Sequence, residues 1–369
     1  MGRLAVGAAI VGLVGSVVVG VPGTADTASA ATLGAGQVAG PEAPEVPGTG
    51  SARPRILFAP GQQGELQERL RREPYRSLFV GLHQRTVQYD TSHDLGDPQI
   101  VAQRDLARAA KNLAFEYALD RTVVDGTVVA FTDAAARSAT GDRVRQLLLH
   151  LYDRSRLAVP APVGGWDRDI NTSEEIVDYA TAFDTLLGAG YPLGSDEAVI
   201  ADRLGRLVTE QYTNYVHPET AGNYAALMQN NHRSKVGAAL AIAAIVLAEW
   251  EPPSGTGPRP IDWFDYGVRE VDDVLRYMLT TGDGAYGEGA YYYRYTAMNL
   301  LPYARAWERH IGPGSYRAGD VVVPSPWRHP LYARTQRWML DTTVPDGGMA
   351  PIDDGNPHRS SYFGVLPAF

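Results

Sequence analysis

A run of seven polar residues stands immediately before the most apolar stretch of the chain. The run comprises Gln229, Asn230, Asn231, His232, Arg233, Ser234 and Lys235. It leads into residues 236–248, which contain no polar side chain and predict a helix that is buried on every face. Buried amides and imidazoles cost free energy unless they are hydrogen-bonded or take part in chemistry. Either Asn230 or Asn231 caps the helix and His232 binds a neighbouring carbonyl, or these groups hold a substrate.

A glycine-rich turn followed by tyrosines is the second candidate site. Residues 282–289 contain four glycines, and they precede Tyr291, Tyr292, Tyr293, Arg294 and Tyr295. A glycine-rich backbone can approach a ligand closely. A tyrosine hydroxyl can act as a base if a nearby cation lowers its pKa, and Arg294 and His232 are the candidates for that cation. Alternatively, the tyrosines pack and keep their hydroxyls at the surface.

Helical spacing separates these tyrosines. At about 100° per residue, Tyr291 and Tyr295 share one face of a helix. Tyr292 shares another face with Thr296 and Asn299, which makes its stripe the more polar of the two.

Two carboxylates in the same turn suggest a different chemistry. Asp283 and Glu288 could form the acid pair of a glycoside hydrolase. However, an aspartate between two glycines is also a common turn residue.

The composition excludes several other classes of protein. The formal net charge of −9 argues against a nucleic-acid binder. Cysteine is absent, which excludes disulfides, thiolate metal sites and a cysteine nucleophile. Lysine occurs only as Lys111 and Lys235, so arginine, which binds carboxylate and sulfate with two hydrogen bonds, carries almost all the positive charge.

The N-terminus predicts export. Arg3 precedes an apolar run over residues 4–21, and Ala28-Ser29-Ala30 follows as a small-residue cleavage site. We therefore expect a signal peptide over residues 1–30, cleaved near Ala30, and a secreted or extracytoplasmic protein. Residues 31–52 are rich in Gly, Ala and Pro, which predicts a flexible linker. The run 236–248 is too short for a membrane span, so we expect none in the mature chain.

Helical periodicity dominates from residue 53 to residue 343. Helices are expected at residues 62–88 with a break around Pro74, 100–119, 133–152, 172–187, 195–216, 236–248, 263–280, 290–310 and 332–340. A capping box from Thr172 to Glu175 and a cap at Ser195 mark two of the starts. Residues 122–132 could form a hairpin and residues 321–323 a short strand, whereas turn signals dominate after residue 344. These patterns predict an all-α protein of antiparallel helical hairpins, with a double-layered α/α barrel as the preferred arrangement.

The candidate stretches resemble the heparinase II/III and alginate lyase group of polysaccharide lyases. The resemblance is carried by three segments: Arg53-Pro54-Arg55-Ile56-Leu57-Phe58; Asn230-Asn231-His232-Arg233-Ser234; and Asp283-Gly284 with Glu288-Gly289-Ala290-Tyr291-Tyr292-Tyr293-Arg294-Tyr295. The matching segments follow one another in order, from about residue 53 to residue 354.

The resemblance implies an incomplete α/α toroid over residues 53–343 and β-elimination at a uronic acid. In that reaction a base removes the proton α to the carboxylate, and an acid protonates the leaving glycosidic oxygen. No cofactor or metal is expected, and the partner is an acidic polysaccharide or oligosaccharide rather than a nucleic acid.

The same resemblance assigns roles residue by residue. It places Asn231 and His232 at the substrate carboxylate, and it makes Tyr292 the proton-transfer residue with Tyr291 as the fallback. The residues expected to bind substrate are Asn230, Arg233, Glu288, Arg294 and Tyr295.

The sequence also departs from the family pattern. Ala290 stands where proline is expected, and Tyr293 stands where glutamine or histidine is usual. The family's β-sandwich domain has no counterpart before Phe369, so we expect residues 344–369 to be an irregular tail that begins a truncated region. Two alternatives stay open: a glycoside hydrolase that uses Asp283 and Glu288 on the same toroid, and a non-catalytic protein that binds acidic glycans.

Overall fold

The computed structural model describes residues 45–92, 95, 100–151, 168–216, 231–278, 282, 284–329 and 332–343, and the account below concerns these alone. They belong to one compact unit, Ala43–Phe369. The expected signal peptide, the first part of the linker and the tail over residues 344–369 lie outside the described residues.

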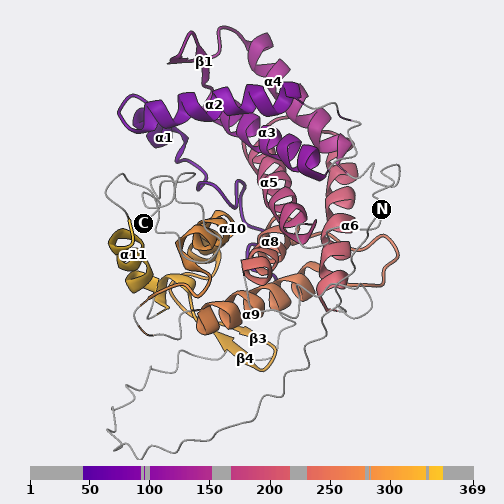
Figure 1. Cartoon of the computed structure of the whole chain (residues 1–369). Coiled ribbons are helices and arrows are strands. Elements are labelled where there is room, and N and C mark those ends of the chain that lie inside the picture. The colour runs from indigo at the N-terminus through magenta and orange to yellow at the C-terminus, as the bar shows by residue number, and fades with distance from the viewer. Residues whose placement is uncertain are drawn as a thin grey trace, which may run out of the picture. The chain divides into compact units, whose positions relative to one another are not determined.

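This part of the chain is mostly helical, which confirms the all-α prediction (Figure 1). The helices are α1 (Gln63–Arg69), α2 (Tyr75–Ser92), α3 (Ile100–Leu119), α4 (Ala134–His150), α5 (Arg168–Gly188), α6 (Asp196–Val216), α8 (Asn231–Val246), α9 (Pro260–Met278), α10 (Gly289–His310) and α11 (Tyr332–Asp341), with a short 3-10 helix, η4 (Pro326–Arg328). Two antiparallel hairpins pair β1 (Thr122–Val124) with β2 (Thr127–Val129) and β3 (Tyr316–Ala318) with β4 (Val321–Val323).

Local chemistry explains several of these boundaries. Asp133 caps α4 by accepting a hydrogen bond from the backbone N–H of Ala136 at 2.7 Å. The first hairpin turns at Asp125 and Gly126, whose φ angles of 48° and 74° suit a tight two-residue turn.

One predicted helix start is wrong. We expected Thr172 and Glu175 to form the capping box that opens a helix, but α5 already includes Arg168. Thr172 and Glu175 are both buried within the helix. The polar residues at this end of α5 therefore face other helices instead of capping their own.

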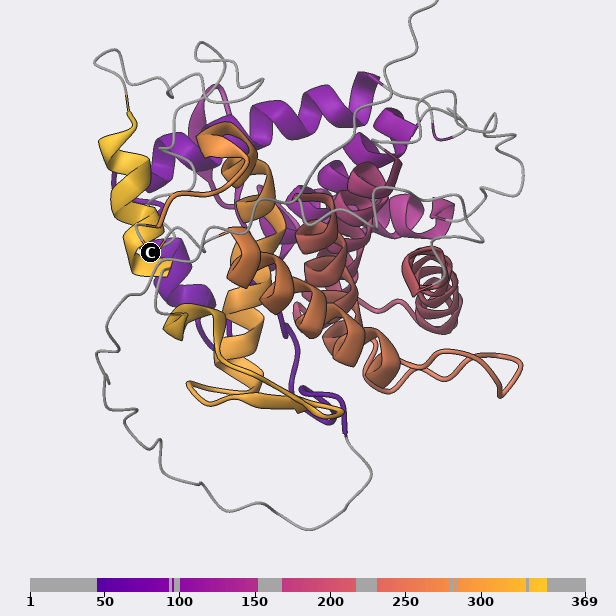
Figure 2. The same ribbon diagram turned by 60° about the horizontal axis from the view of Figure 1, so that its bottom comes forward.

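The apolar helix α8 is the centre of the fold. Of its residues only Arg233 is not buried, and α8 packs against α5, α9 and α10 (Figures 1 and 2). The helix begins at Asn231, five residues before the apolar stretch 236–248, so Asn231 and His232 lie in its first turn. No helix in the described part of the chain has both the length and the apolar character needed to cross a membrane.

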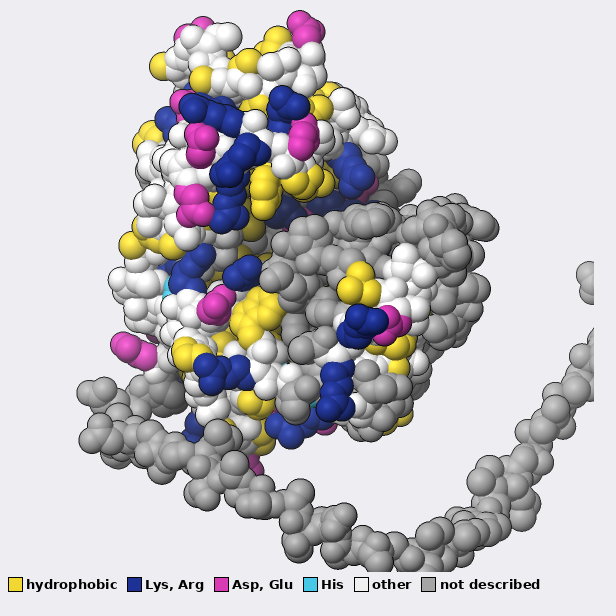
Figure 3. Space-filling model, turned by 90° about the vertical axis from the view of Figure 1, so that its left-hand side faces the viewer, with side chains coloured by type: hydrophobic (Ala, Val, Ile, Leu, Met, Phe, Trp, Pro, Cys, Tyr) yellow, Lys and Arg dark blue, Asp and Glu magenta, His cyan; other side chains and the backbone are white. Residues whose placement is uncertain are grey.

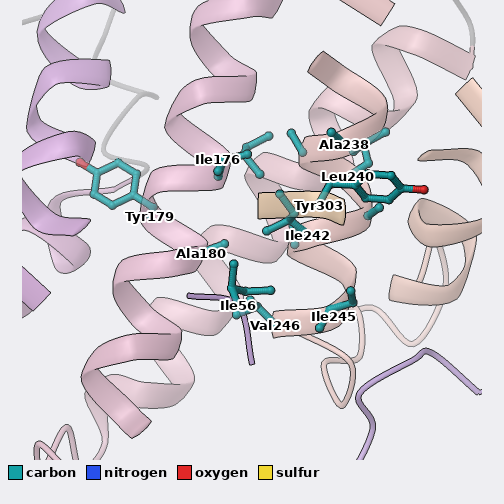
Figure 4. Close-up of a cluster of buried hydrophobic side chains, with 14 of the residues drawn as sticks. Ile56, Ile176, Tyr179, Ala180, Ala238, Leu240, Ile242, Ile245, Val246 and Tyr303 are labelled. Atoms are coloured by element: carbon teal, nitrogen blue, oxygen red, sulfur yellow. The ribbon is translucent and has the colours of Figure 1, made fainter. Parts of the chain in front are cut away.

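Residues 45–58, which precede α1, cross the C-terminal ends of α5, α8 and α10, and we call this segment the strap. Ile56 inserts between α5 and α8, beside Ala180 and Val246 (Figure 4). The buried Asp184 of α5 accepts hydrogen bonds from the backbone N–H of Arg55 at 2.5 Å and of Ile56 at 3.0 Å.

Other contacts fasten the strap to α8 and α10. The guanidinium of Arg55 pairs with Glu249 just after α8, and His310 of α10 bonds the backbone oxygen of Arg55 at 2.8 Å. Residues 47–50, within the segment that we expected to be flexible linker, form a turn, and Val46 is buried.

Two glycines bring α8 and α9 unusually close together. A Cβ added to Gly237 of α8 would lie 2.7 Å from the backbone oxygen of Gly267 of α9, and one added to Gly267 would meet the oxygen of Gly237. Both contacts are with backbone, so the helices themselves would have to move apart.

Replacing Gly267 by alanine is therefore expected to destabilise the domain by about 1–3 kcal/mol through overpacking. Gly81 of α2 is the matched control because an added Cβ there meets nothing within 4 Å. Gly81→Ala should be neutral or stabilising by up to about 1 kcal/mol, since alanine favours the helix. Urea denaturation of the two variants checks the prediction, and equal midpoints would contradict it.

Candidate functional site

Glu288 joins the two stretches that the sequence singled out. It directly precedes α10, and its carboxylate accepts a hydrogen bond from the backbone N–H of Asn231 at 2.6 Å. The side-chain amide of Asn231 donates a second bond at 3.1 Å to the other carboxylate oxygen. The N-termini of α8 and α10 therefore lie side by side.

The same bonds give Glu288 a structural task. Besides Asn231, the hydroxyl of Tyr286 donates to the Glu288 carboxylate at 3.5 Å. Both carboxylate oxygens thus act as acceptors towards donors from the protein. Glu288 thereby ties the start of α8 to the start of α10. Asp283, the other acid of the glycoside hydrolase alternative, lies outside the described residues.

Asn231 carries an unusual polar atom. The residue is 2% exposed, and within the described part of the chain its side-chain oxygen accepts no hydrogen bond although it is buried. A buried acceptor without a partner costs roughly 1–3 kcal/mol. Asn230 lies outside the described residues.

His232 is oriented by an aspartate from another helix. Its Nδ1 lies 3.0 and 3.1 Å from the two carboxylate oxygens of Asp169 on α5. A carboxylate only accepts hydrogen bonds, so Nδ1 carries a proton, and Nε2 is the ring nitrogen that does not face Asp169. The hydroxyl of Tyr215 on α6 also donates to Asp169. Sequence reasoning missed Asp169, because nothing in its local pattern distinguishes it from other helix-start acids.

The tyrosines form one cluster at the start of α10. The hydroxyls of Tyr291 and Tyr295 lie 3.2 Å apart, and the ring of Tyr292 packs edge-on against that of Tyr291 with centroids 5.5 Å apart. Tyr292 is partly exposed, whereas His232 is 8% exposed.

The more polar stripe of α10 serves packing. Thr296 and Asn299 are both buried. Thr296 lies 2.8 Å from the hydroxyl of Tyr286, and the Asn299 amide donates to the backbone oxygen of Lys235 at 3.1 Å. The polar character of the stripe that Tyr292 begins thus fixes α10 on α8, and it is no argument for Tyr292 as the catalytic tyrosine.

Two cations lie near the ring of Tyr295. The Lys235 Nζ is 5.4 Å from the ring centroid, and the Arg294 Cζ is 5.2 Å from it. Arg294 also lies 5.6 Å from the ring of Tyr291. Cation–π contacts of this kind hold the tyrosines and Arg294 as one unit.

Lys235 belongs to a buried charge network that spans three helices. Its ammonium, which is fully buried, pairs with Glu174 of α5, and Arg108 of α3 pairs with the same carboxylate. The chain's other lysine, Lys111 of α3, pairs with Asp178, one turn further along α5. Burial alone would raise the pKa of Glu174, but Lys235 and Arg108 lower it below its ordinary value of 4.5.

Sequence could have pointed to this network. The chain uses lysine only twice, and both lysines pair with neighbouring acids of α5. Glu174 and Asp178 are spaced four apart on a buried helix, which places them on one face.

Arg233 pairs with two acids of α9. Its guanidinium lies 2.5 Å from Glu270 and 3.4 Å from Asp273. Arg233 therefore ties α8 to α9, and its expected role at a substrate carboxylate stays a prediction.

Comparisons with known proteins add no assignment: no family model matches this chain, and no curated protein matches it either.

Proposed function

We propose that this chain is a secreted polysaccharide lyase that cleaves a uronic-acid-containing glycan by β-elimination, on a helical scaffold of the incomplete α/α-toroid type. The observation that carries the proposal is the pair of hydrogen bonds from Asn231 to Glu288. These bonds hold the start of α8, which carries the amide and the imidazole, against the start of α10, which carries the tyrosines. The resemblance to the heparinase II/III and alginate lyase group supplies the reaction.

In this proposal the start of α8 binds the uronate carboxylate. An amide nitrogen carries two hydrogens, and Asn231 uses one of them for Glu288. Charge accumulates on the carboxylate as the α-proton leaves, and each donor aimed at it contributes about 3–4 kcal/mol to transition-state stabilisation. Asp169 acts through His232, because it fixes the tautomer and orientation of the imidazole.

Tyr292 then moves the proton, with Tyr291 as the fallback. The partial exposure of Tyr292 suits a group that must meet a polymer. As a phenolate, which a nearby cation such as Arg294 would favour, it takes the α-proton, and the phenol so formed gives that proton to the leaving glycosidic oxygen. The ring of Tyr295 packs against that of Tyr292, and Arg294 lies over the rings of Tyr295 and Tyr291.

A single assay tests the proposal. The purified chain is incubated separately with alginate, heparan sulfate, chondroitin and hyaluronan, and the ultraviolet absorbance of the 4,5-unsaturated uronate is followed. We expect the absorbance to rise with at least one polymer. New reducing ends without the chromophore would indicate hydrolysis instead, and binding without any product would indicate a glycan-binding protein.

A further inference from the structure

A cavity of about 300 Å³ lies between the strap and the later turns of α10. Its walls also include parts of α3, α5 and η4. Its size is at the lower end of the range for small-molecule sites. Among the residues that the structure describes, none that belongs to the candidate site lines this cavity, so the two are separate. The lining includes Leu57, Lys111, Met298, Pro302, Arg305 and Trp327.

The wall of the cavity is largely apolar. Leu57 and Met298, at 39% and 41% exposed, leave more surface open to solvent than large apolar side chains usually do. The Trp327 indole N–H is bonded to the backbone oxygen of Ala304 at 2.8 Å, so this donor is used within the protein. A ligand with an apolar side chain of its own would gain free energy by covering these surfaces.

A break in the hydrogen bonding of α10 adds an acceptor to the wall. Pro302 lies inside this helix and has no backbone N–H, so it cannot donate to the carbonyl oxygen of Met298, four residues earlier. Met298 and Pro302 both line the cavity. The Met298 oxygen can therefore accept a hydrogen bond from an N–H group of a ligand.

A cluster of charges beside the cavity holds more cations than acids. Within the described part of the chain, four cations of α3 and α8 share three acids of α3 and α5. The cations are Arg104, Arg108, Lys111 and Lys235, and the acids are Asp105, Glu174 and Asp178.

Lys111 is the member of this cluster that lines the cavity. Its side chain is 30% exposed, whereas that of its partner Asp178 is 6% exposed. The ammonium is thus the partner that a ligand reaches, and the surplus of positive charge in the cluster favours an anion.

Arg305 is the second cation at the cavity. It pairs with Glu308 at 3.2 Å on the surface of α10, and its Cζ lies 5.4 Å from the centroid of the Trp327 ring. A guanidinium has five hydrogens to donate, so Arg305 can keep this pair and still bind a carboxylate of a ligand. Figure 3 shows basic and hydrophobic side chains side by side on one face of the molecule.

We propose that this cavity binds the anion of a small N-acylated amino acid with an apolar side chain, such as N-acetylleucine. Its carboxylate lies at Lys111 and Arg305, its amide N–H donates to the Met298 oxygen, and its side chain covers Leu57 and Trp327. This site is independent of the proposed lyase activity, because the two sites share no residue in the described part of the chain.

Four related ligands test the site on the full chain, with binding followed by saturation-transfer NMR. N-acetyl-L-leucine is expected to bind with a Kd on the order of 1 mM, which is usual for a ligand of its size. N-acetyl-L-leucinamide lacks the charge and N-acetylglycine lacks the side chain, so each should bind about tenfold more weakly or worse. An analogue with an ester oxygen in place of the amide N–H keeps both features and should bind about fivefold more weakly.

A substitution in the wall tests the place of binding. Met298→Glu should weaken binding of N-acetyl-L-leucine about tenfold or more, because it puts a negative charge beside the carboxylate. Leu340→Glu on α11 is the control, since Leu340 is 53% exposed and does not line the cavity. Both replaced side chains are exposed, so we expect both variants to fold, and thermal unfolding without ligand checks this.

Three results would overturn the site. They are no binding of N-acetyl-L-leucine at about 10 mM, equal affinity of the wild type for N-acetyl-L-leucine and any one of the three analogues, and an affinity that Met298→Glu leaves unchanged.

Discussion

Tyr292→Phe is expected to lower kcat for uronate elimination about 10²–10⁴-fold, which is the range for removing a general acid or base. The change removes one oxygen and keeps the ring that packs against Tyr291, so the fold and the affinity for substrate should stay the same. The measurement is the rate of chromophore release at saturating substrate. A 10³-fold loss corresponds to about 4 kcal/mol of transition-state stabilisation.

Tyr277→Phe is the control, because Tyr277 lies on α9 and is 55% exposed. It should leave kcat unchanged. His232→Ala should also abolish most activity, since it removes the group that Asp169 orients. If Tyr292→Phe keeps full activity while Tyr291→Phe loses it, the neighbouring tyrosine transfers the proton. If activity survives all three changes, the assignment of the site is wrong.

Glu174→Gln is expected to destabilise the domain by about 3–5 kcal/mol, the usual cost of removing one partner of a buried ion pair. The change leaves the fully buried Lys235 without its counter-charge. Guanidinium denaturation at neutral pH gives the difference. Glu65→Gln is the control because Glu65 pairs with Arg69 at the surface, where such pairs contribute roughly 0–1 kcal/mol. Adding Lys235→Met to Glu174→Gln should recover much of the loss, because the charge that lacked a partner is then gone.

The same pair makes stability depend on pH. The pKa of Glu174 is lower in the folded protein than its ordinary value of 4.5, because Lys235 and Arg108 outweigh burial. Its contribution is therefore fully present above pH 4.5 and is lost as the pH falls through the folded-state pKa. Denaturation curves from neutral to acid pH should show the free energy of unfolding of the wild type falling towards that of Glu174→Gln. A constant difference across that range would contradict this account.

Sequence patterns predicted the elements better than the contacts between them. The α3 helix spans residues 100–119 as expected, because its apolar residues recur at helical spacing. The capping box predicted at Thr172 was wrong because a capping box is a local pattern. The α5 helix starts earlier, and its polar residues bond to other helices. Periodicity also predicted that α8 is buried all round, but it could not say which helices surround it.

The candidate site shows the same contrast between what local sequence predicts and what only tertiary contacts decide. Local sequence placed polar groups at the start of α8 and tyrosines at the start of α10, and Glu288 proves to connect them. Asp169 lies 63 residues from His232 in sequence, so only the tertiary fold brings them together. Arg233 was assigned from its neighbours in the chain, and its pairing with Glu270 of α9 is a contact that local sequence does not reveal.

The strap has a consequence for the order in which the protein is made. Its contacts with Arg309 and His310 join residues 255 positions apart, so α10 must be synthesised before the strap can complete its contacts. Contacts of such long range form late, because much of the chain must be ordered before they can close. Until then the strap has partners in α5 and just after α8, but none in α10.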